Sequence, residues 1–179
     1  MGGIDALTRL LADFPANCPP TAIVLQAEPA VVEAFIAGMD KEARCTVRAA
    51  RDGADLTQGV VHVAADPAHH AVLEPGRPSV IKLLDLEPVE GARPSANLLY
   101  ATMARAGIPA TGVVLSGIGE DGAKGLKMLR DAGADTQVQD PSMATVAETP
   151  AAAIAAGGAA ATVPLDALAE ALLTTCSMA

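Results

Sequence analysis

A strand, a glycine-rich turn and a helix follow one another between residues 112 and 132, and this order constrains the fold more than any other stretch. The β-branched apolar run at 112–115 predicts a buried strand, and residues 123–132 predict a helix. The turn between them, 117–122, contains one acid well placed for function, Asp121. Open α/β sheets bind their ligands at turns of this kind, at the carboxyl ends of parallel strands. We therefore expect the functional site here.

The rest of the chain alternates helices with single apolar strands. Helical spacing is found at 4–11, 31–39, 95–106, 150–156 and 165–173, and strands are expected at 21–26, 45–49, 60–64 and 136–139. Two short runs, 71–74 and 80–84, flank a turn and predict an antiparallel hairpin. The alanine-rich segment 151–161 is interpreted as the end of a helix. The predicted fold class is α/β, with a mainly parallel, doubly wound, Rossmann-like sheet covered by helices on both faces. We expect a single domain over residues 1–179.

Composition narrows the classes of function. The chain has 12 Lys and Arg against 21 Asp and Glu, a net charge of -9, which argues against binding to nucleic acid. Cys18, Cys45 and Cys176 lack the spacing of metal ligands, so we expect unreactive thiols in a reducing cytoplasm and neither a metal nor a cofactor. No signal peptide is evident, and the longest apolar stretch, 151–163, is too short for membrane insertion.

The glycine turn allows three interpretations. Gly117, Gly119 and Gly122 match the dinucleotide-binding pattern G-x-G-x-x-G, although Glu120 and Asp121 would repel a pyrophosphate. Alternatively, Asp121 is an ionised carboxylate that orients a histidine, while N–H groups around Ile118 and Gly119 stabilise an oxyanion. The third interpretation is that Asp121 only caps a helix. The turn alone leaves all three open.

Residues 113–126 strongly resemble the signature of the CheB-type chemotaxis receptor methylesterases. The resemblance extends upstream to Arg93-Pro-Ser-Ala-Asn-Leu-Leu99 and to 61–69, and downstream to 139–143, 149–154 and 163–165. That family hydrolyses glutamate methyl esters on chemoreceptors, and deamidates certain glutamines, with a serine, a histidine and an aspartate. The resemblance implies that Asp121 is the aspartate of this triad. It places Ile118 near the oxyanion site, in the same turn as Gly119 and Gly122.

The same resemblance implies that the other two members of the triad are missing. Gly2 and Gly3 match the end of the family's Ser-Thr-Gly-Gly turn, so the serine and the strand leading to it would lie before residue 1. The family's histidine follows a glutamine, and here Ala27 follows Gln26. None of His62, His69, His70 or Ser116 has a sequence context that suggests a substitute.

We therefore expect a CheB-like domain of a bacterial chemosensory system that cannot hydrolyse receptor methyl esters, a pseudoenzyme that acts in signal transduction as a binding adaptor. Its expected partners are chemoreceptors or other chemosensory proteins. The alternative is an active protein-glutamate methylesterase and deamidase within an intact parent protein, and the second alternative is a dinucleotide-binding domain. A sheet without the family's first strand would have a gap or an exposed edge, so we also expect a homo-oligomer.

Overall fold

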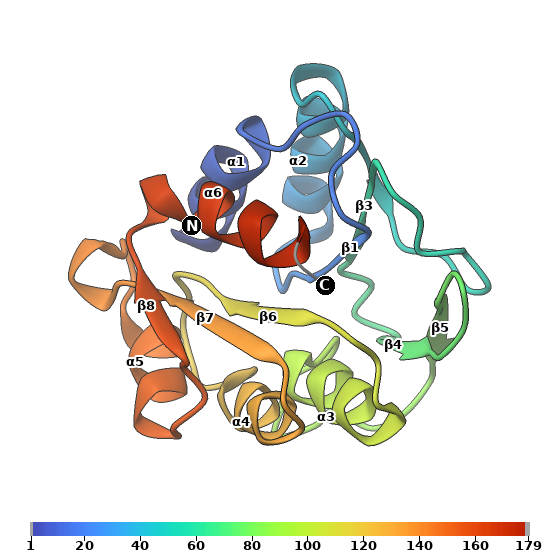
Figure 1. The fold of residues 1–179 in the computed structure, drawn as a ribbon. Helices are drawn as coiled ribbons and strands as arrows, with labels where there is room; N and C mark the ends of the chain where they lie inside the picture. The colour runs from blue at the N-terminus through green and yellow to red at the C-terminus, as the bar shows by residue number, and fades with distance from the viewer. Residues whose placement is uncertain (1, 178–179) are drawn as a thin grey trace.

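The computed structural model describes residues 2–177, in which helices cover both faces of parallel strands (Figure 1). Helices α1, α2 and α6 lie on one side of the strands, and α3, α4 and α5 lie on the other. The helices are α1 (Gly2–Ala12), α2 (Pro29–Glu42), α3 (Ala96–Ala106), α4 (Ala123–Asp131), α5 (Glu148–Ala155), α6 (Leu165–Ser177) and the 3-10 helix η1 (Pro141–Met143). The strands are β1 (Thr21–Val24), β2 (Thr46–Ala49), β3 (Val60–Ala64), β4 (His70–Glu74), β5 (Val80–Leu84), β6 (Thr111–Val114), β7 (Asp135–Gln139) and β8 (Ala161–Val163).

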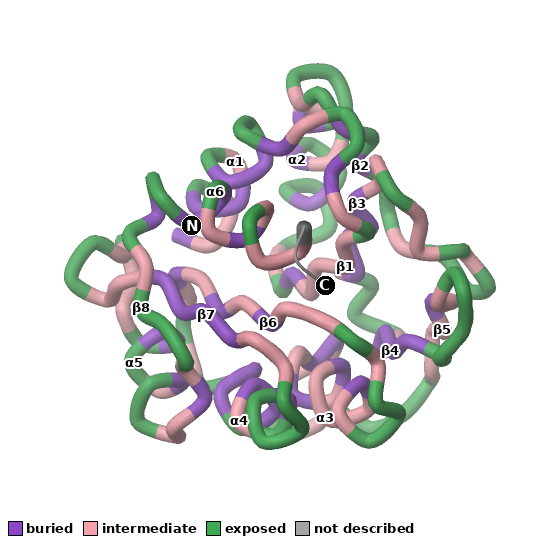
Figure 2. The backbone as a smooth tube through the Cα atoms, in the orientation of Figure 1, coloured by how far each residue is buried: buried purple, intermediate pink, exposed green. Residues whose placement is uncertain are grey.

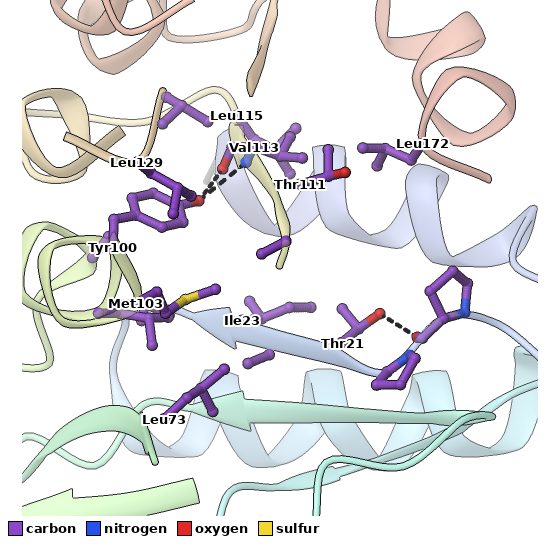
Figure 3. Close-up of a pocket in the computed structure, with 18 of the residues that line it drawn as sticks. Thr21, Ile23, Leu73, Tyr100, Met103, Thr111, Val113, Leu115, Leu129 and Leu172 are labelled. Carbon is purple, nitrogen blue, oxygen red and sulfur yellow. Dashed lines mark hydrogen bonds between the residues drawn. The ribbon is translucent and has the colours of Figure 1, made fainter. Parts of the chain in front are cut away.

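The parallel strands form two separate sheets. One has the order β1-β3-β2 and the other β6-β7-β8, while β4 and β5 form the predicted antiparallel hairpin. The α/β class, the parallel pairing and the hairpin are thus confirmed. Strands β1 and β6 run in the same direction without pairing, which leaves between the two parallel sheets the gap expected of a sheet without the family's first strand (Figure 3). We call the space between these two strands the slot.

Buried apolar side chains form a cluster on each side of the slot. The first group, which we call the α1–α6 core, includes Leu7, Leu11, Val61, Val63 and Leu168. The second, the α3 core, contains Leu73, Ile81, Leu99, Met103 and Leu129. Buried backbone is concentrated where helices pack against strands, whereas the loops are mostly exposed (Figure 2). The slot therefore lies where a strand would be expected to join the two cores.

Local sequence explains the ends of α3, which begins at the functional edge. The side chain of Ser95 accepts a hydrogen bond from the N–H of Leu98 at 3.3 Å, as an N-cap does. Gly107 ends the helix with φ +62°, a left-handed conformation that glycine adopts without a steric penalty. Both ends agree with the prediction for residues 95–106.

Strand β8 was not predicted from the sequence. Ala161–Val163 pairs with β7, with Ala161 opposite Gln137 and Val163 opposite Gln139. A segment of three residues is too short to show the alternation of apolar and polar side chains that predicts a strand. Its extended conformation therefore depends on hydrogen bonding to the edge of β7. Among the helices of residues 2–177, none combines the length and apolar character that a bilayer-spanning segment requires.

Candidate functional site

Asp121 lies in the turn between β6 and α4, at the carboxyl edge of the parallel strands. Two glycines with positive φ, Gly119 at +85° and Gly122 at +93°, shape this turn. A residue with a side chain would be strained at either position. The position of the turn confirms the expectation that the carboxylate follows the strand and precedes the helix.

Both oxygens of the Asp121 carboxylate accept hydrogen bonds. The donors are Ser95 Oγ at 2.8 Å, the N–H of Ala96 at 2.7 Å, the N–H of Asn97 at 3.0 Å and Gln26 Nε2 at 2.9 Å. Three of these four donors belong to the start of α3, whose free N–H groups favour a negative charge. Asp121 therefore caps α3, which is a neighbouring helix and not the helix that follows it in sequence.

The end of β1 faces the same carboxylate. Gln26 bridges the two sides of the slot, since its Nε2 donates to the backbone oxygen of Pro94 at 2.8 Å as well as to Asp121. The next residue is Ala27, whose methyl group cannot accept or transfer a proton. The amide of Gln26 holds Asp121 by a hydrogen bond but is no general base, because an amide does not titrate near neutral pH.

A serine and a histidine lie close to Asp121, but their connections are not those of a catalytic triad. His70 Nδ1 lies 3.2 Å from the backbone N–H of Ser95, and its Nε2 lies 3.1 Å from the carbonyl oxygen of Glu87. In a triad the imidazole bonds to both the serine hydroxyl and the acid. Here Ser95 Oγ bonds directly to Asp121, and both Ser95 and His70 are 0 % exposed. The arrangement therefore fixes loops to α3 and gives a substrate no access to the hydroxyl.

Gly2 and Gly3 lie at the start of α1, against the end of β6. A Cβ added to Gly2 would lie 2.4 Å from Ser116 Oγ, and one added to Gly3 would lie 3.1 Å from the Ser116 carbonyl oxygen. Ser116 is 4 % exposed, and its hydroxyl donates to Val146 O at 3.2 Å and accepts from Val146 N at 2.9 Å. These glycines permit close packing of the helix on the strand end, and Ser116 has no free hydroxyl to attack a substrate.

The N-terminus of α4 already has an acceptor for its N–H groups. Asn97 Oδ1 accepts from the N–H of Gly122 at 3.0 Å and from the N–H of Gly125 at 2.8 Å. A pyrophosphate bound in the dinucleotide mode would need these donors. The geometry therefore does not favour dinucleotide binding.

Comparison with known proteins decides the family, because the family model described as CheB methylesterase matches residues 1–172. The chain belongs to the CheB methylesterase family. A protein-glutamate methylesterase/protein-glutamine glutaminase of Rhizobium etli is 37% identical over 173 residues, covering 96% of this chain and 50% of the relative. A similarly named protein of Anaeromyxobacter dehalogenans is 40% identical over 173 residues, covering 96% and 49%. The chain thus spans about half the length of the curated relatives it matches.

The CheB fold is found in a solved structure as well. The crystal structure of the Thermotoga maritima CheB methylesterase catalytic domain matches with a TM-score of 0.90 at 24% identity, over 97% of this chain and 93% of that one. The resemblance drawn from residues 113–126 is therefore confirmed for both family and fold. The role of each site residue stays a prediction.

Within the CheB-type turn, the backbone N–H groups of Ile118 and Gly119 differ from that of Gly122 in whether they donate a hydrogen bond to the protein. In residues 2–177, no protein group accepts a hydrogen bond from the N–H of Ile118 or of Gly119, and the Ile118 side chain is 80% exposed. These two N–H groups are therefore free, whereas the N–H of Gly122 donates to Asn97. The binding of an oxyanion by this turn stays a prediction.

Two titratable groups outside the turn, His62 and Cys18, are buried. His62 is 1% exposed, and burial, with Arg48 beside it, lowers its pKa. Burial and the neighbouring Cys45 raise the pKa of Cys18 to about 12, which agrees with an unreactive thiol. Within the described part of the chain, no three His, Cys, Asp or Glu side chains are grouped so as to hold a metal ion.

Sequence reasoning missed the partners of Asp121. Ser95 and the N–H groups of Ala96 and Asn97 lie 24 to 26 positions before Asp121 in sequence, and Gln26 lies 95 positions before it. The signal that could have found Ser95 was its position before a predicted helix, since a serine there is a typical N-cap.

Proposed function

We propose that this chain is a CheB-type domain that binds chemosensory proteins, chemoreceptors among them, without hydrolysing glutamate methyl esters. The observation that carries this proposal is the set of donors around Asp121, which are a hydroxyl, two backbone N–H groups and an amide, with no imidazole. Asp121, the carboxylate that would orient the histidine of a catalytic triad, instead accepts hydrogen bonds from the start of α3.

The chemistry of ester hydrolysis supports the same conclusion. A serine nucleophile needs a base within hydrogen-bonding reach, and the loss of either group costs several orders of magnitude in rate. The two serines near the turn, Ser95 and Ser116, are 0% and 4% exposed and already hydrogen-bonded. Ala27 leaves no base beside them.

Two exposed apolar side chains at the carboxyl edge fit a binding role. Ile118 follows β6 and is 80% exposed, and Met143 in η1 follows the neighbouring strand β7 and is 54% exposed. Exposed apolar groups beside a satisfied polar cluster are typical of protein contact surfaces. We propose that these two side chains contact the partner.

The alternative is an active methylesterase and deamidase in an intact parent protein. It is favoured by the names of the curated relatives and by the half of their length that this chain spans. It requires an accessible serine and a base from outside residues 2–177, because Ser95, the serine that hydrogen-bonds to Asp121, is 0% exposed, and no imidazole in the described residues contacts that carboxylate.

Methanol release from methylated chemoreceptor membranes separates the two functions. We expect no methanol from this chain above a protein-free blank, while the Thermotoga maritima catalytic domain serves as a reference for the assay. Binding to the same membranes should be saturable at micromolar concentration. Turnover that Asp121→Ala abolishes would overturn the proposal, and absence of binding would remove the adaptor role.

Substitutions at the edge test the contact surface. Ile118→Glu and Met143→Glu should each weaken binding about tenfold, as loss of a buried apolar contact does. Ile154→Glu is the matched control, since Ile154 is 39% exposed late in α5, at the opposite end of that helix from the turn. Equal effects of the three substitutions would point to a general charge effect instead of a defined surface.

A further inference from the structure

Strand β8 forms an open edge of the second parallel sheet. The order β6-β7-β8 places β7 and β6 between β8 and the slot, so β8 lies at the opposite side of this sheet from the slot (Figure 1). Among the strands of residues 2–177, β8 pairs only with β7. Ala161 and Thr162 are exposed, and Val163 is half-buried. The outer edge of β8 is therefore accessible to another polypeptide.

Thr162 carries the unpaired backbone groups of this edge. The N–H of Asp140, just after β7, donates to the carbonyl oxygen of Val163 at 2.9 Å, so Val163 directs its backbone groups toward β7. Successive residues of a strand direct their N–H and C=O groups to opposite sides. Those of Thr162 consequently point away from β7, and no group in residues 2–177 is hydrogen-bonded to them.

The edge is also free of charge. Residues 149–165 form the longest stretch of the sequence without an acidic or basic side chain. Asp166, which follows this stretch, is ion-paired with Arg9. The whole chain has a net charge of -9, so two copies repel each other over most of their surface. A neutral edge is the place where two such copies can approach without this repulsion.

The edge strand β2 of the other parallel sheet is protected in a way that β8 is not. The N–H of Val47 donates to Asp40 Oδ1 at 2.9 Å, and the strand contains the exposed, charged Arg48. Covered backbone groups and charged side chains keep edge strands from pairing. In β8, the length of three residues and the absence of an N–H in Pro164 only restrict how far pairing can extend. The chain thus leaves one short edge open, at Thr162.

We propose that two copies of this chain pair through β8, antiparallel, about a two-fold axis at Thr162. In an antiparallel ladder, two directly opposed residues exchange both of their N–H···O bonds. Thr162 opposite the partner's Thr162 therefore satisfies the free groups of both copies, and the same surface is used twice, as two-fold symmetry requires. The proposal goes beyond the adaptor function, because it concerns a different surface and holds whether or not chemoreceptors bind.

Two main-chain hydrogen bonds between small side chains predict a weak dimer, which sedimentation equilibrium detects between micromolar and millimolar concentration. The average mass should rise from 17.9 kDa toward twice this value. Added salt should promote the rise, because it screens the repulsion between the two acidic copies. A chain that remains monomeric up to millimolar concentration, with or without salt, would overturn the proposal.

Amide hydrogen exchange, measured by NMR, locates the contact. The N–H of Thr162 is free in the monomer and should exchange at least about tenfold more slowly in the dimer. The N–H of Gly119, which is also free but lies in the turn before α4, should exchange at the same rate in both. Association that leaves exchange at Thr162 unchanged uses another surface and would overturn the proposal.

A charge at the centre of the contact tests the same surface. Thr162→Asp places two like charges opposite each other across the two-fold axis and should weaken dimerisation about tenfold. Thr46→Asp is the matched control, because Thr46 is also exposed on an edge strand, β2, and the variant gains the same charge. Equal weakening by the two substitutions would indicate general charge repulsion and overturn the proposal.

A second variant removes the backbone donor itself. Thr162→Pro lacks the outward N–H but keeps the ladder with β7, in which Ala161 and Val163 take part. Because two donors are lost in the symmetric dimer, association should weaken at least about tenfold. A Thr162→Pro protein that has the circular dichroism of the original chain and dimerises equally well would overturn the proposal.

Discussion

Asn97 and Asp121 cap each other's helices across the carboxyl edge of the sheet. Asn97, in the first turn of α3, accepts from the N–H groups of Gly122 and Gly125 at 3.0 and 2.8 Å. Asp121, just before α4, accepts from the N–H groups of Ala96 and Asn97 at 2.7 and 3.0 Å. This exchange satisfies donors that neither helix could satisfy alone and holds α3 against α4.

Asn97→Ala should destabilise the protein. The change leaves the N–H groups of Gly122 and Gly125 without an acceptor in a buried position, which costs about 1–3 kcal/mol. Urea denaturation measures the loss. Asn97→Asp keeps an acceptor oxygen but loses the donor to Glu90 and adds a negative charge beside it, so it should recover only part of the stability. A change below about 0.5 kcal/mol in the alanine variant would contradict the reciprocal cap.

Asp121→Ala should be destabilising because four hydrogen bonds to α3 and β1 are lost together. We expect about 2–4 kcal/mol from the loss of a charged helix cap, and about half of this for Asp121→Asn, which keeps one acceptor oxygen. Thermal melting provides the measurement. Gln26→Ala is the control, because it removes one exposed donor and should cost under about 1 kcal/mol. A stable Asp121→Ala protein would show that the residue does not hold the fold.

Two glycine-to-alanine substitutions should act in opposite directions. A Cβ at Gly125 would lie 2.7 Å from the backbone oxygen of Asn97, so Gly125→Ala should force α3 and α4 apart at a cost of about 1–3 kcal/mol. Gly38 lies within α2 and has no atom within 4 Å of its Cβ position, so Gly38→Ala should stabilise by about 0.4–1 kcal/mol. Unfolding midpoints of the two variants, compared side by side, check both signs.

Stability should fall as the pH drops from 7 to 5, in part because of His62. Burial, and next the charge of Arg48, lower the pKa of His62 in the folded protein. As the pH falls below about 6.5, His62 gains a proton in the unfolded chain before it does in the folded one. The contribution of neutral His62 to the free energy of unfolding is therefore complete above that pH and is lost below it. For one proton the slope cannot exceed about 1.4 kcal/mol per pH unit. His62→Gln should flatten the pH dependence measured by denaturation, and an unchanged slope would assign it to another group.

Local pattern was sufficient for most of the secondary structure. Runs such as 60–64 and 112–115 are apolar enough to be strands, and the alternation of strands with helices requires parallel pairing. The exception was β8 at Ala161–Val163, where three residues carry no period of their own and the edge of β7 selects the conformation. The turn that holds Asp121 could be located from the sequence, because its glycines stand between an apolar run and a helical pattern. The hydrogen-bond partners of Asp121 could not, because they come from the residues after β1 and from the start of α3, which are distant in sequence.

The order of elements, the hairpin, the glycine turn and the family all follow from residues close together in sequence, because hydrophobic period, turn chemistry and motif spacing act over a few positions. Only the tertiary structure decided what each side chain does. It placed Ser95 on Asp121, Asn97 on the start of α4 and the Tyr100 hydroxyl on Val113. These contacts depend on how helices and strands pack in space, and buried polar groups then bond to whichever donor or acceptor the packing brings within reach.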